Sequence, residues 1–238
     1  MKVKVIGCGG IGLCLIPVLT RFINYSVDKF PLSEIHLIDG DVYEEKNRSR
    51  QGFSDFGPKA TVTANGLRKE FGRTTIYDHP VYLDDDNIVR HIRENDIVMM
   101  CVDNHTSRKL VSERVSELDN VTLISGGNDE TDGNVMIHIR RNGENITPPI
   151  TQYHKEISSP KDLHPNQLNQ PGSCTRIANE KPQIVIVNNL IAATMLSAFY
   201  NLTDSSIYSN RVLTNRQQYG EVFLDMLSMK AVVPDRVV

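Results

Sequence analysis

The feature that most limits how this chain can fold is a glycine-rich turn placed directly after its first apolar run. Val3–Ile6 is a short apolar segment, and GCGGIG follows it at Gly7–Gly12. From Leu13 to about Tyr25 the residues have helical spacing, and Pro17 falls in the first turns, where it is tolerated or kinks the helix. We therefore predict a strand, a tight turn and a helix. The backbone N–H groups of such a turn favour an anionic ligand, although the same motif also forms turns that bind nothing.

The rest of the first half alternates between apolar strands and helical segments. The sequence predicts further strands at Glu34–Asp39, Thr74–His79, Asp96–Asn104 and Val121–Gly127, and helices at about Lys59–Phe71, Asp84–Glu94 and Thr106–Leu118. Alternation at crossover spacing predicts an α/β fold with a Rossmann-like, doubly wound and mostly parallel sheet. Ligands of such sheets lie beyond the carboxyl ends of the strands, where the glycine turn, Asp39 and Asp103 all fall.

The second half has a different character. Val135–Arg140 alternates like a strand, and the residues from Thr147 to Ser173 form a long loop rich in Pro, Asn, Gln and Ser. Gln183–Leu202 is an apolar helix, and late strands follow at Gly220–Met226 and Lys230–Val233. We predict a single domain over residues 1–238. It has a nucleotide-binding core (1–133) and a C-terminal extension (134–238) that contains the loop, the helix and the late strands.

Composition narrows the class of protein. The 238 residues carry a net charge of −3 with a pI of about 6.2, so nothing indicates a nucleic-acid or membrane partner. No apolar run approaches the roughly 20 residues of a membrane span, and the N-terminus lacks a signal-peptide pattern, so we expect a cytoplasmic protein. The four cysteines form no CxxC pair, which argues against both a disulfide framework and a structural zinc site.

The stretch after the second strand decides between kinds of nucleotide chemistry. Asp39 ends that strand and can accept hydrogen bonds from ribose hydroxyls, unless it is only a solvated carboxylate. Asn47 and Arg50 follow in IDGDVYEEKNRSRQ, and Lys59 lies shortly beyond. Hydride transfer has no general need for cations here, whereas neutralising a triphosphate does. The alternative for these side chains is an ordinary charged surface loop.

A second acidic strand end lies at CVDN. Asp103 follows a buried strand, and a carboxylate that faces bound phosphates is a natural Mg²⁺ ligand. Asn104 and Arg108 are its polar neighbours. The alternative role is a helix N-cap, which either Asp103 or Asn104 can fill without any ligand.

Taken in order, GCGGIG, IDGD with NRSRQ, GPK and CVDN resemble the ThiF/MoeB/HesA family within the ubiquitin-activating-enzyme superfamily. The pattern spans about Val3 to Arg108. The resemblance implies an ATP site formed by Gly7, Gly9, Gly10, Gly12, Asp39, Asp41, Asn47, Arg50, Gln51, Lys59, Asp103 and Asn104.

By the same resemblance, Asp39 binds ribose, Asn47, Arg50 and Lys59 contact the phosphates, and Asp103 handles Mg²⁺. Arg50, Lys59 and Asp103 are then the catalytic side chains. The implied reaction is attack by the C-terminal glycine carboxylate of a small ubiquitin-like or sulfur-carrier protein on the α-phosphate of ATP. It gives an acyl-adenylate and pyrophosphate, and the carrier would end in Gly-Gly. The family also implies a homodimer.

The chain departs from the family pattern in three respects. Its loop between Arg50 and Lys59 is short, the paired CxxC motifs of many bacterial members are absent, and so are the N-terminal helices. In homodimeric members an Arg from those helices reaches the partner's ATP site. We therefore expect no zinc, and either another Arg, a different partner or weaker catalysis.

Cys174 lies in PGSCTRIANEKP, where members that form thioesters keep a cysteine. A loop cysteine near a helix start and Arg176 can act as a nucleophile, but a structural role without catalysis is the opposing interpretation. The apolar helix at Gln183–Leu202 is similarly open to two interpretations, core packing or a dimer face.

The sequence leaves three other functions open. The first is adenylation of a different acceptor, such as a tRNA base carboxylate or a peptide C-terminus. The second is an NAD-dependent oxidoreductase, which would give Arg50 and Lys59 no role. The third is a non-catalytic nucleotide-binding scaffold, against which the set of polar site residues argues.

Overall fold

A mixed β-sheet forms the centre of the computed structural model, which describes residues 1–26, 28–30, 32–48, 51–168, 185–203 and 220–234. Its strands are β1 (Lys2–Ile6), β2 (Glu34–Ile38), β5 (Thr75–His79), β6 (Asp96–Met100), β7 (Val121–Asn128), β8 (Asp132–Arg141), β9 (Glu144–Asn145), β10 (Glu221–Asp225) and β11 (Lys230–Val232). The order in the sheet is β11-β10-β8-β7-β6-β1-β2-β5, with β9 beside β8. A separate small hairpin pairs β3 (Val42–Tyr43) with β4 (Gly57–Pro58).

The sheet has a parallel and an antiparallel part. Strands β5, β2, β1, β6 and β7 run parallel, while β8, β10 and β11 extend the sheet in antiparallel fashion. The prediction of a mostly parallel, doubly wound core with late strands added is therefore confirmed. The central strand β1 is buried on both faces, and its apolar residues Val3, Val5 and Ile6 lie in the two hydrophobic cores. Lys4 is also buried, and only Lys2 at the start of the strand is exposed.

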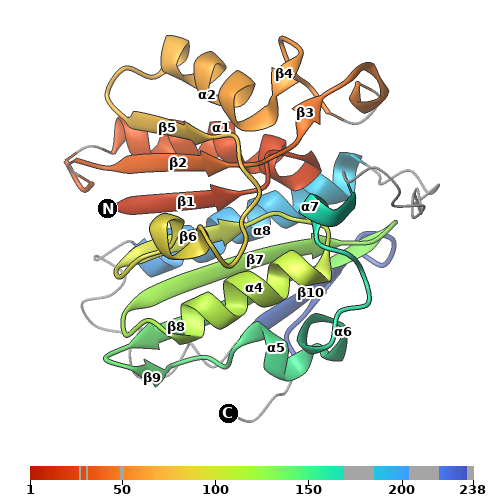
Figure 1. Cartoon of the computed structure of the whole chain (residues 1–238). Helices are drawn as coiled ribbons and strands as arrows, with labels where there is room; N and C mark the ends of the chain where they lie inside the picture. The colour runs from red at the N-terminus through yellow and green to blue at the C-terminus, as the bar shows by residue number, and fades with distance from the viewer. Residues whose placement is uncertain (27, 31, 49–50, 169–184, 204–219, 235–238) are drawn as a thin grey trace.

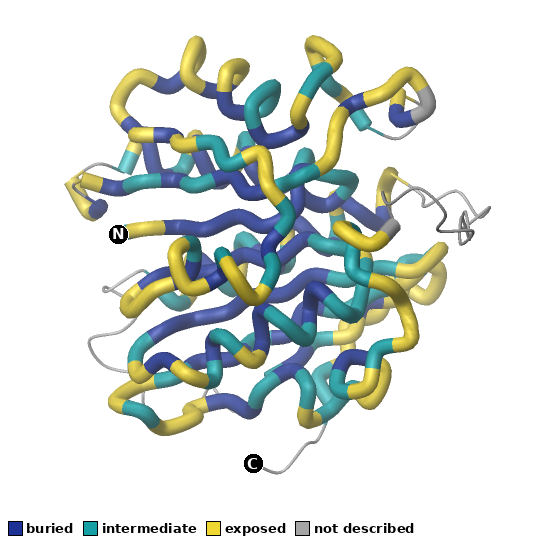
Figure 2. The backbone as a smooth tube through the Cα atoms, in the orientation of Figure 1, coloured by how far each residue is buried: buried dark blue, intermediate teal, exposed yellow. Residues whose placement is uncertain are grey.

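Helices cover both faces of the sheet (Figure 1). They are α1 (Gly10–Tyr25), α2 (Lys59–Glu70), α3 (Ile88–His91), α4 (His105–Ser116), α5 (Ile150–Tyr153), α6 (Lys155–Ser158), α7 (Pro165–Leu168) and α8 (Val185–Thr203), with a 3₁₀ turn η1 (Glu45–Asn47). One hydrophobic core lies between the sheet and α1, α2 and α8, and the second between the sheet and α3 to α6. Figure 2 shows the buried layers running along the strands between these helices.

Helix α8 packs one face on the sheet. Val187, Ile191, Met195 and Phe199 recur at every fourth position and are buried, because this spacing forms one stripe of a helix. By length and composition alone α8 is apolar enough to cross a membrane, a test that the core helix of a globular protein also passes. Its contacts with β7, β8 and α1 make it a core helix here.

The chain crosses the sheet between β5 and β6. It builds β1, β2 and β5 in one direction and then returns to place β6 on the other side of β1. The carboxyl ends of β1 and β6 therefore diverge into a crevice, which is where ligands bind in open α/β sheets. The glycine turn follows β1 directly into this crevice.

Close backbone contacts explain the glycines of that turn. Gly7 has φ of +97°, and a Cβ there would lie 2.9 Å from the carbonyl oxygen of Cys101. At Gly12 a Cβ would lie 2.1 Å from the carbonyl oxygen of Gly7. Helix α1 begins at Gly10, earlier than the predicted Leu13, so its first turn packs tightly on the end of β1.

Two predictions about regular structure are wrong in extent. The helix expected over Asp84–Glu94 is the single turn α3, because Asp84 and Asn87 bond each other's backbone N–H at 3.1 and 3.2 Å and close a tight turn before it. The segment expected as a loop from Thr147 contains the one-turn helices α5, α6 and α7 up to Leu168, and residues 169–173 lie outside the described residues.

A row of rings lies on β2, β5 and α3. Nδ1 of His36 and Nε2 of His79 are 3.0 Å apart, His36 stacks on Tyr77, and His91 meets His79 edge-on. Burial, followed by the positive charge of Lys4, lowers the pKa of His36 from 6.5 to about 4. His36 is therefore neutral in the folded protein at neutral pH.

The glycine turn gives a first testable prediction. Gly12→Ala should destabilise the fold by about 1–3 kcal/mol or more, because its methyl group overlaps the Gly7 carbonyl. Gly66→Ala is the matched control, since nothing lies within 4 Å of a Cβ at this exposed helix position. It should stabilise α2 by about 0.5–1 kcal/mol. Denaturant unfolding measures both, and equal stability of the two variants would contradict the packing described here.

The ring cluster predicts a stability change in acid. The folded pKa of His36 is below its unfolded value, so this histidine stabilises the fold above pH 6.5 and loses that contribution as pH falls toward about 4. In His36→Gln the slope of unfolding free energy against pH should decrease over this range by up to about one proton. Urea unfolding at stepped pH measures it, and an unchanged slope would contradict the assignment.

Candidate functional site

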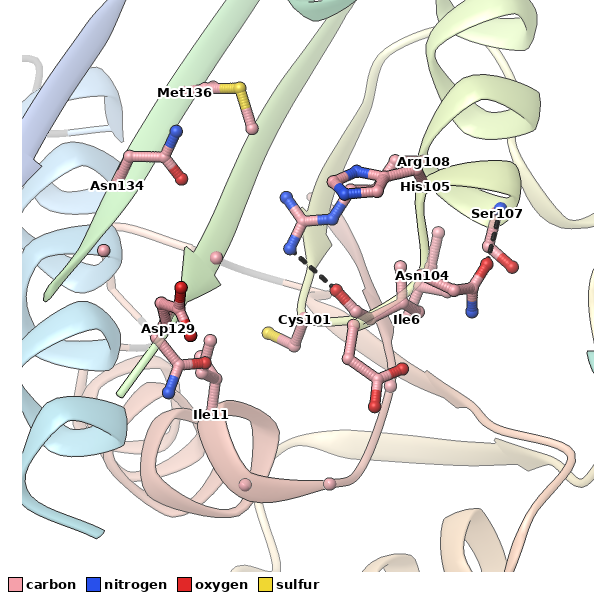
Figure 3. Close-up of a pocket in the computed structure, with 18 of the residues that line it drawn as sticks. Ile6, Ile11, Cys101, Asn104, His105, Ser107, Arg108, Asp129, Asn134 and Met136 are labelled. Carbon is pink, nitrogen blue, oxygen red and sulfur yellow. Dashed lines mark hydrogen bonds between the residues drawn. The ribbon is translucent and has the colours of Figure 1, made fainter. Parts of the chain in front are cut away.

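A cavity of about 1120 Å³ opens at the carboxyl ends of β1, β2 and β6 and extends over β7, β8 and β10. Figure 3 shows the part around α4 and the ends of β6, β7 and β8. Of the predicted ATP-site residues, those that line the cavity are Gly7, Gly9, Gly10, Asp39, Asp41, Asn47, Gln51, Lys59, Asp103 and Asn104. Gly12 supports the turn from behind, and Arg50 lies outside the described residues.

Asp39 fixes the glycine turn to the end of β2. Its Oδ2 accepts a hydrogen bond from the backbone N–H of Cys8 at 2.6 Å, and its Oδ1 accepts one from Asp41 at 2.8 Å. Burial raises the pKa of Asp39, although the charge of Lys59 and these two N–H bonds act against the rise. Each oxygen keeps a further lone pair for a hydroxyl donor. Asp39, which is predicted to bind ribose, therefore also connects the glycine turn to the end of β2.

Lys59 is a buried cation at the start of α2. Its Nζ donates to Oδ2 of Asp41 at 2.9 Å, and its backbone N–H donates to the Asp41 carbonyl. Burial lowers the pKa of Lys59, but the charges of Asp39, Asp41 and Asp103 outweigh burial and the net pKa is raised. The pairing of β3 with β4 brings Lys59 back to the strand ends. It therefore stays charged beside the glycine turn.

The segment after β3 brings two amides to the cavity. Asn47 ends η1, where its Oδ1 accepts the backbone N–H of Glu44 at 2.9 Å, and it is buried. Gln51 follows with its N–H on the Asn47 carbonyl. The side-chain oxygen Oε1 of Gln51 is buried and has no hydrogen-bond partner among the described residues. An amide left in this state beside Gly9 fits a site in which a polar ligand completes the contacts.

The structure separates the two roles considered for CVDN. Asn104 is the N-cap of α4, and its Oδ1 accepts the N–H of Ser107 at 2.7 Å. Asp103 is exposed to the cavity and takes part in no hydrogen bond or ion pair with a described residue. Its carboxylate therefore remains available for a cation. A single carboxylate suits Mg²⁺ held mainly by phosphate oxygens, and no three-ligand His, Cys, Asp or Glu group occurs in the described part.

Two lining residues and one neighbour of the glycine turn were not assigned from the sequence. The lining residue Arg108 is buried under the cavity floor. The neighbour is Asn188 of α8, since a Cβ at Gly10 would lie 2.6 Å from its Nδ2. A buried asparagine in a mostly apolar helix is the signal that points to Asn188. The second lining residue is His154, in the predicted loop. Its position follows from long-range packing, which no local pattern reveals.

His154, which lies between α5 and α6, connects this part of the chain to β10. Its Nε2 hydrogen bonds Glu221, and its Nδ1 lies 3.0 Å from Oε1 of Glu156. Asn134 donates to the same Glu221 oxygen at 2.7 Å. The hydrogen bond with Glu221 raises the pKa of His154, and burial acts against the rise. This network fixes the far wall of the cavity.

The described cysteines are unsuited to nucleophilic attack. Burial, then the charge of Asp39, raises the pKa of the Cys8 thiol, and burial raises that of Cys101 to about 12. A thiol with a raised pKa gives little thiolate. The candidate nucleophile Cys174 lies outside the described residues, so thioester chemistry stays a prediction.

Comparison with known proteins agrees with this architecture. Residues 1–229 match the ThiF family. The adenylyltransferase and sulfurtransferase UBA4 of Saccharomyces cerevisiae is 24% identical over 212 residues, which is 87% of this chain and 44% of UBA4. The protein of the same name from Pyricularia oryzae is 30% identical over 140 residues, 57% of this chain and 27% of that protein. The chain thus spans less than half the length of these curated relatives.

Solved structures share the fold. Escherichia coli MccB with ATP covers 98% of this chain at a TM-score of 0.64 and 19% identity, and the match takes up 63% of that protein. The microcin C7 biosynthetic enzyme MccB in complex with N-formylated MccA gives a TM-score of 0.68 over 98% of this chain and 64% of its own, also at 19% identity. Because the family match runs over nearly the whole chain, the protein belongs to the ThiF family.

Proposed function

We propose that the chain is an ATP-dependent adenylyltransferase that activates a C-terminal carboxylate. One observation carries the proposal. A glycine turn at a helix start, the buried cation Lys59 and the available carboxylate of Asp103 share one crevice. This is the set needed to hold and neutralise a triphosphate. The names of the UBA4 relatives, and MccB solved with ATP, support the same activity.

The proposed reaction is a nucleotidyl transfer. A carboxylate oxygen of the acceptor forms a bond to the α-phosphorus of ATP. The bond from that phosphorus to the oxygen bridging to the β-phosphate breaks, and pyrophosphate leaves with the electron pair. Lys59 and the N–H groups at the start of α1 stabilise charge that develops on the phosphates. Mg²⁺, if held by Asp103, would supply further neutralisation of the phosphate oxygens.

The acceptor that we propose is a small ubiquitin-like or sulfur-carrier protein ending in Gly-Gly. The sequence relatives named adenylyltransferase and sulfurtransferase favour it. A peptide carboxylate is the second candidate, because MccB has been solved with MccA. An NAD-dependent oxidoreductase gives no reason for the buried cation Lys59, and a tRNA acceptor is at odds with the net negative charge.

A pyrophosphate-exchange assay tests the activity. Asp103→Asn should lower ATP–pyrophosphate exchange by about 100-fold, since it removes the carboxylate that would hold Mg²⁺ near the phosphates. Asp119→Asn, at an exposed position away from the cavity, is the matched control and should exchange at the wild-type rate. The acceptors tested are small proteins ending in Gly-Gly and short peptides with a free carboxylate. Full exchange in Asp103→Asn would sink the role given to Asp103.

We also propose a homodimer built on the outer face of α1 and α8. A shallow groove of about 410 Å³ on this face is lined by apolar side chains that include Val18, Phe22 and Leu196. Val18 lies on the mostly apolar helix α1, and its side chain is 49% exposed to solvent in this groove. An apolar surface of this kind on a helix pair is typical of a subunit contact.

Sedimentation velocity tests the dimer. Val18→Asp places a charge in the groove and should convert the protein to a monomer, because an unpaired charge in an apolar contact is costly. Val89→Asp is the matched control: Val89 is 50% exposed on α3, on the opposite face of the sheet, and should leave the assembly unchanged. If both variants and the wild type sediment alike, the groove is not the subunit contact.

A further inference from the structure

The cavity continues well beyond the nucleotide crevice. Its far half is lined by the β7–β8 hairpin, by the segment that carries α6, and by β10. The residues of the glycine turn and Lys59 belong to the near half. If the near half binds ATP as proposed above, the far half is the space left for the acceptor. The acceptor chemistry assigned to the far half rests on that proposed function.

Arg108 lies between the two halves. It is 5% exposed, and its guanidinium occupies the gap between the ends of β6 and β7. Its Nη2 donates to the carbonyls of Val102 and Gly126, each at 2.8 Å, and its Nη1 donates to Ser125 at 3.2 Å. Figure 3 shows the guanidinium reaching from α4 toward the open middle of the cavity, with Asn134 and Met136 across from it.

The charge of this guanidinium is only partly compensated in the described part of the chain. Burial lowers the pKa of Arg108, and the charges of Asp103 and Asp162 offset the effect of burial only in part. No described carboxylate lies within 4.0 Å of the guanidinium, and its Nε is buried with no hydrogen-bond partner. Three of the five N–H donors of an Arg are accounted for by the bonds to neutral oxygens. A buried cation without a carboxylate at ion-pair distance is costly, and an anion that reaches it from the cavity lowers that cost. Arg108 is therefore placed to bind an anion that enters the cavity.

The far wall carries the opposite charge. Asp129 and Asp132 lie at the tip of the β7–β8 hairpin, and Asp132 is paired in register with Asp225 of β10. Like charges directly opposite each other destabilise a sheet, and only Lys230, opposite Asp225 on β11, offsets them in the described register. Asp225 also bonds Ser228 in the following turn. The side chain of Asp132 makes no hydrogen bond with a described residue, so no described contact of this kind stabilises its carboxylate.

The register of the β7–β8 hairpin gives the distance between the positive charge of Arg108 and the negative charge of Asp132. Arg108 lies beside Gly127, where a Cβ would be 2.8 Å from its Nη2. Gly127 pairs with Asn134, Asn128 pairs with Gly133, and Asp132 lies one further position along the hairpin. Two strand positions correspond to about 7 Å, the span of about two residues of an extended chain. A ligand that contacts both Arg108 and Asp132 would therefore have a negative group at its end, beside Arg108. It would have a positive group about two residues before that end, beside Asp132.

We propose that Arg108 binds the terminal carboxylate of the acceptor, and that Asp129, Asp132 and Asp225 select an acceptor with basic residues shortly before that carboxylate. The acceptor is thus a protein or peptide C-terminus with basic residues near its end. An acidic terminus is repelled by the far wall. The negative charges of the three aspartates discriminate between basic and acidic acceptors. The guanidinium of Arg108 orients the terminal carboxylate of the acceptor.

Peptide binding tests the proposal without requiring catalysis. The probes are three fluorescent short peptides: one ending in Lys-Lys-Gly-Gly with a free carboxylate, the same peptide with an amidated end, and one with Glu in place of Lys. Anisotropy is measured with a non-hydrolysable ATP analogue and Mg²⁺. The lysine peptide should bind, and amidation or the change to Glu should each weaken binding by about tenfold or more. Equal binding of the three peptides, or no binding of the lysine peptide, overturns the proposal.

Two variants with matched controls assign the effect to residues. The double variant Asp129→Asn/Asp132→Asn should remove most of the preference for Lys over Glu while its thermal stability stays equal or rises, because a cross-strand repulsion is relieved. Asp119→Asn should keep the preference. Arg108→Lys should reduce the difference between the free and amidated peptides, and Arg114→Lys on the same helix should not. If Arg108→Lys fails to fold, the double variant still decides the proposal, since a retained Lys preference in it refutes the role of the wall.

The two proposals fail in different ways. The lysine peptide could bind only with a free carboxylate while the protein shows no pyrophosphate exchange. This result would support the acceptor site and contradict the adenylation activity. Carrier-dependent exchange that is equally fast with acidic and basic ends would keep adenylation and overturn the inference about the acceptor.

Discussion

The contact between the first turn of α1 and the end of β1 is the constraint on which the site depends. A Cβ at Gly12 would lie 2.1 Å from the Gly7 carbonyl oxygen, and a Cβ at Gly7 would lie 2.9 Å from the Cys101 carbonyl oxygen, in the backbone just after β6. Asp39 then ties the same turn to β2 through two backbone N–H bonds. Three parallel strands and one helix start are therefore fixed around a single crevice. A side chain at Gly12 would push the helix start away from the strands and open this arrangement.

Two buried cations divide the cavity, and their different surroundings give them different roles. Lys59 lies beside Asp41 with Asp39 near, so its charge is compensated before any ligand arrives. Arg108 is held by backbone carbonyls and a hydroxyl, and the charges of Asp103 and Asp162 compensate its burial only in part. The first arrangement suits a side chain that shares its charge with phosphates. The arrangement around Arg108 suits a side chain that binds an anionic group of a ligand.

Residues 146–168, which follow β9, line one side of the cavity. Asp162 accepts the N–H groups of His105 and Thr106 at 2.6 and 3.1 Å, so this segment is attached to the start of α4. At its other side His154 is attached to Glu221 of β10. Sequence separations of 57 and 67 residues are bridged in this way, and the C-terminal extension becomes part of the site rather than an appendage.

The sequence by itself determined the parallel core, the glycine turn and the placement of Asp39, Lys59 and Asp103 at one edge, because each of these follows from local spacing and strand order. Only the tertiary structure decided that Asn104 rather than Asp103 caps α4, and that Arg108 is buried without a carboxylate beside it. It also reduced the expected helix over Asp84–Glu94 to one turn. The burial of Arg108 depends on which distant segments pack around it, and a local pattern of residues does not contain that information. The cap and the shortened helix depend on which of several nearby polar side chains accepts a backbone N–H, a choice that the residue types alone leave open.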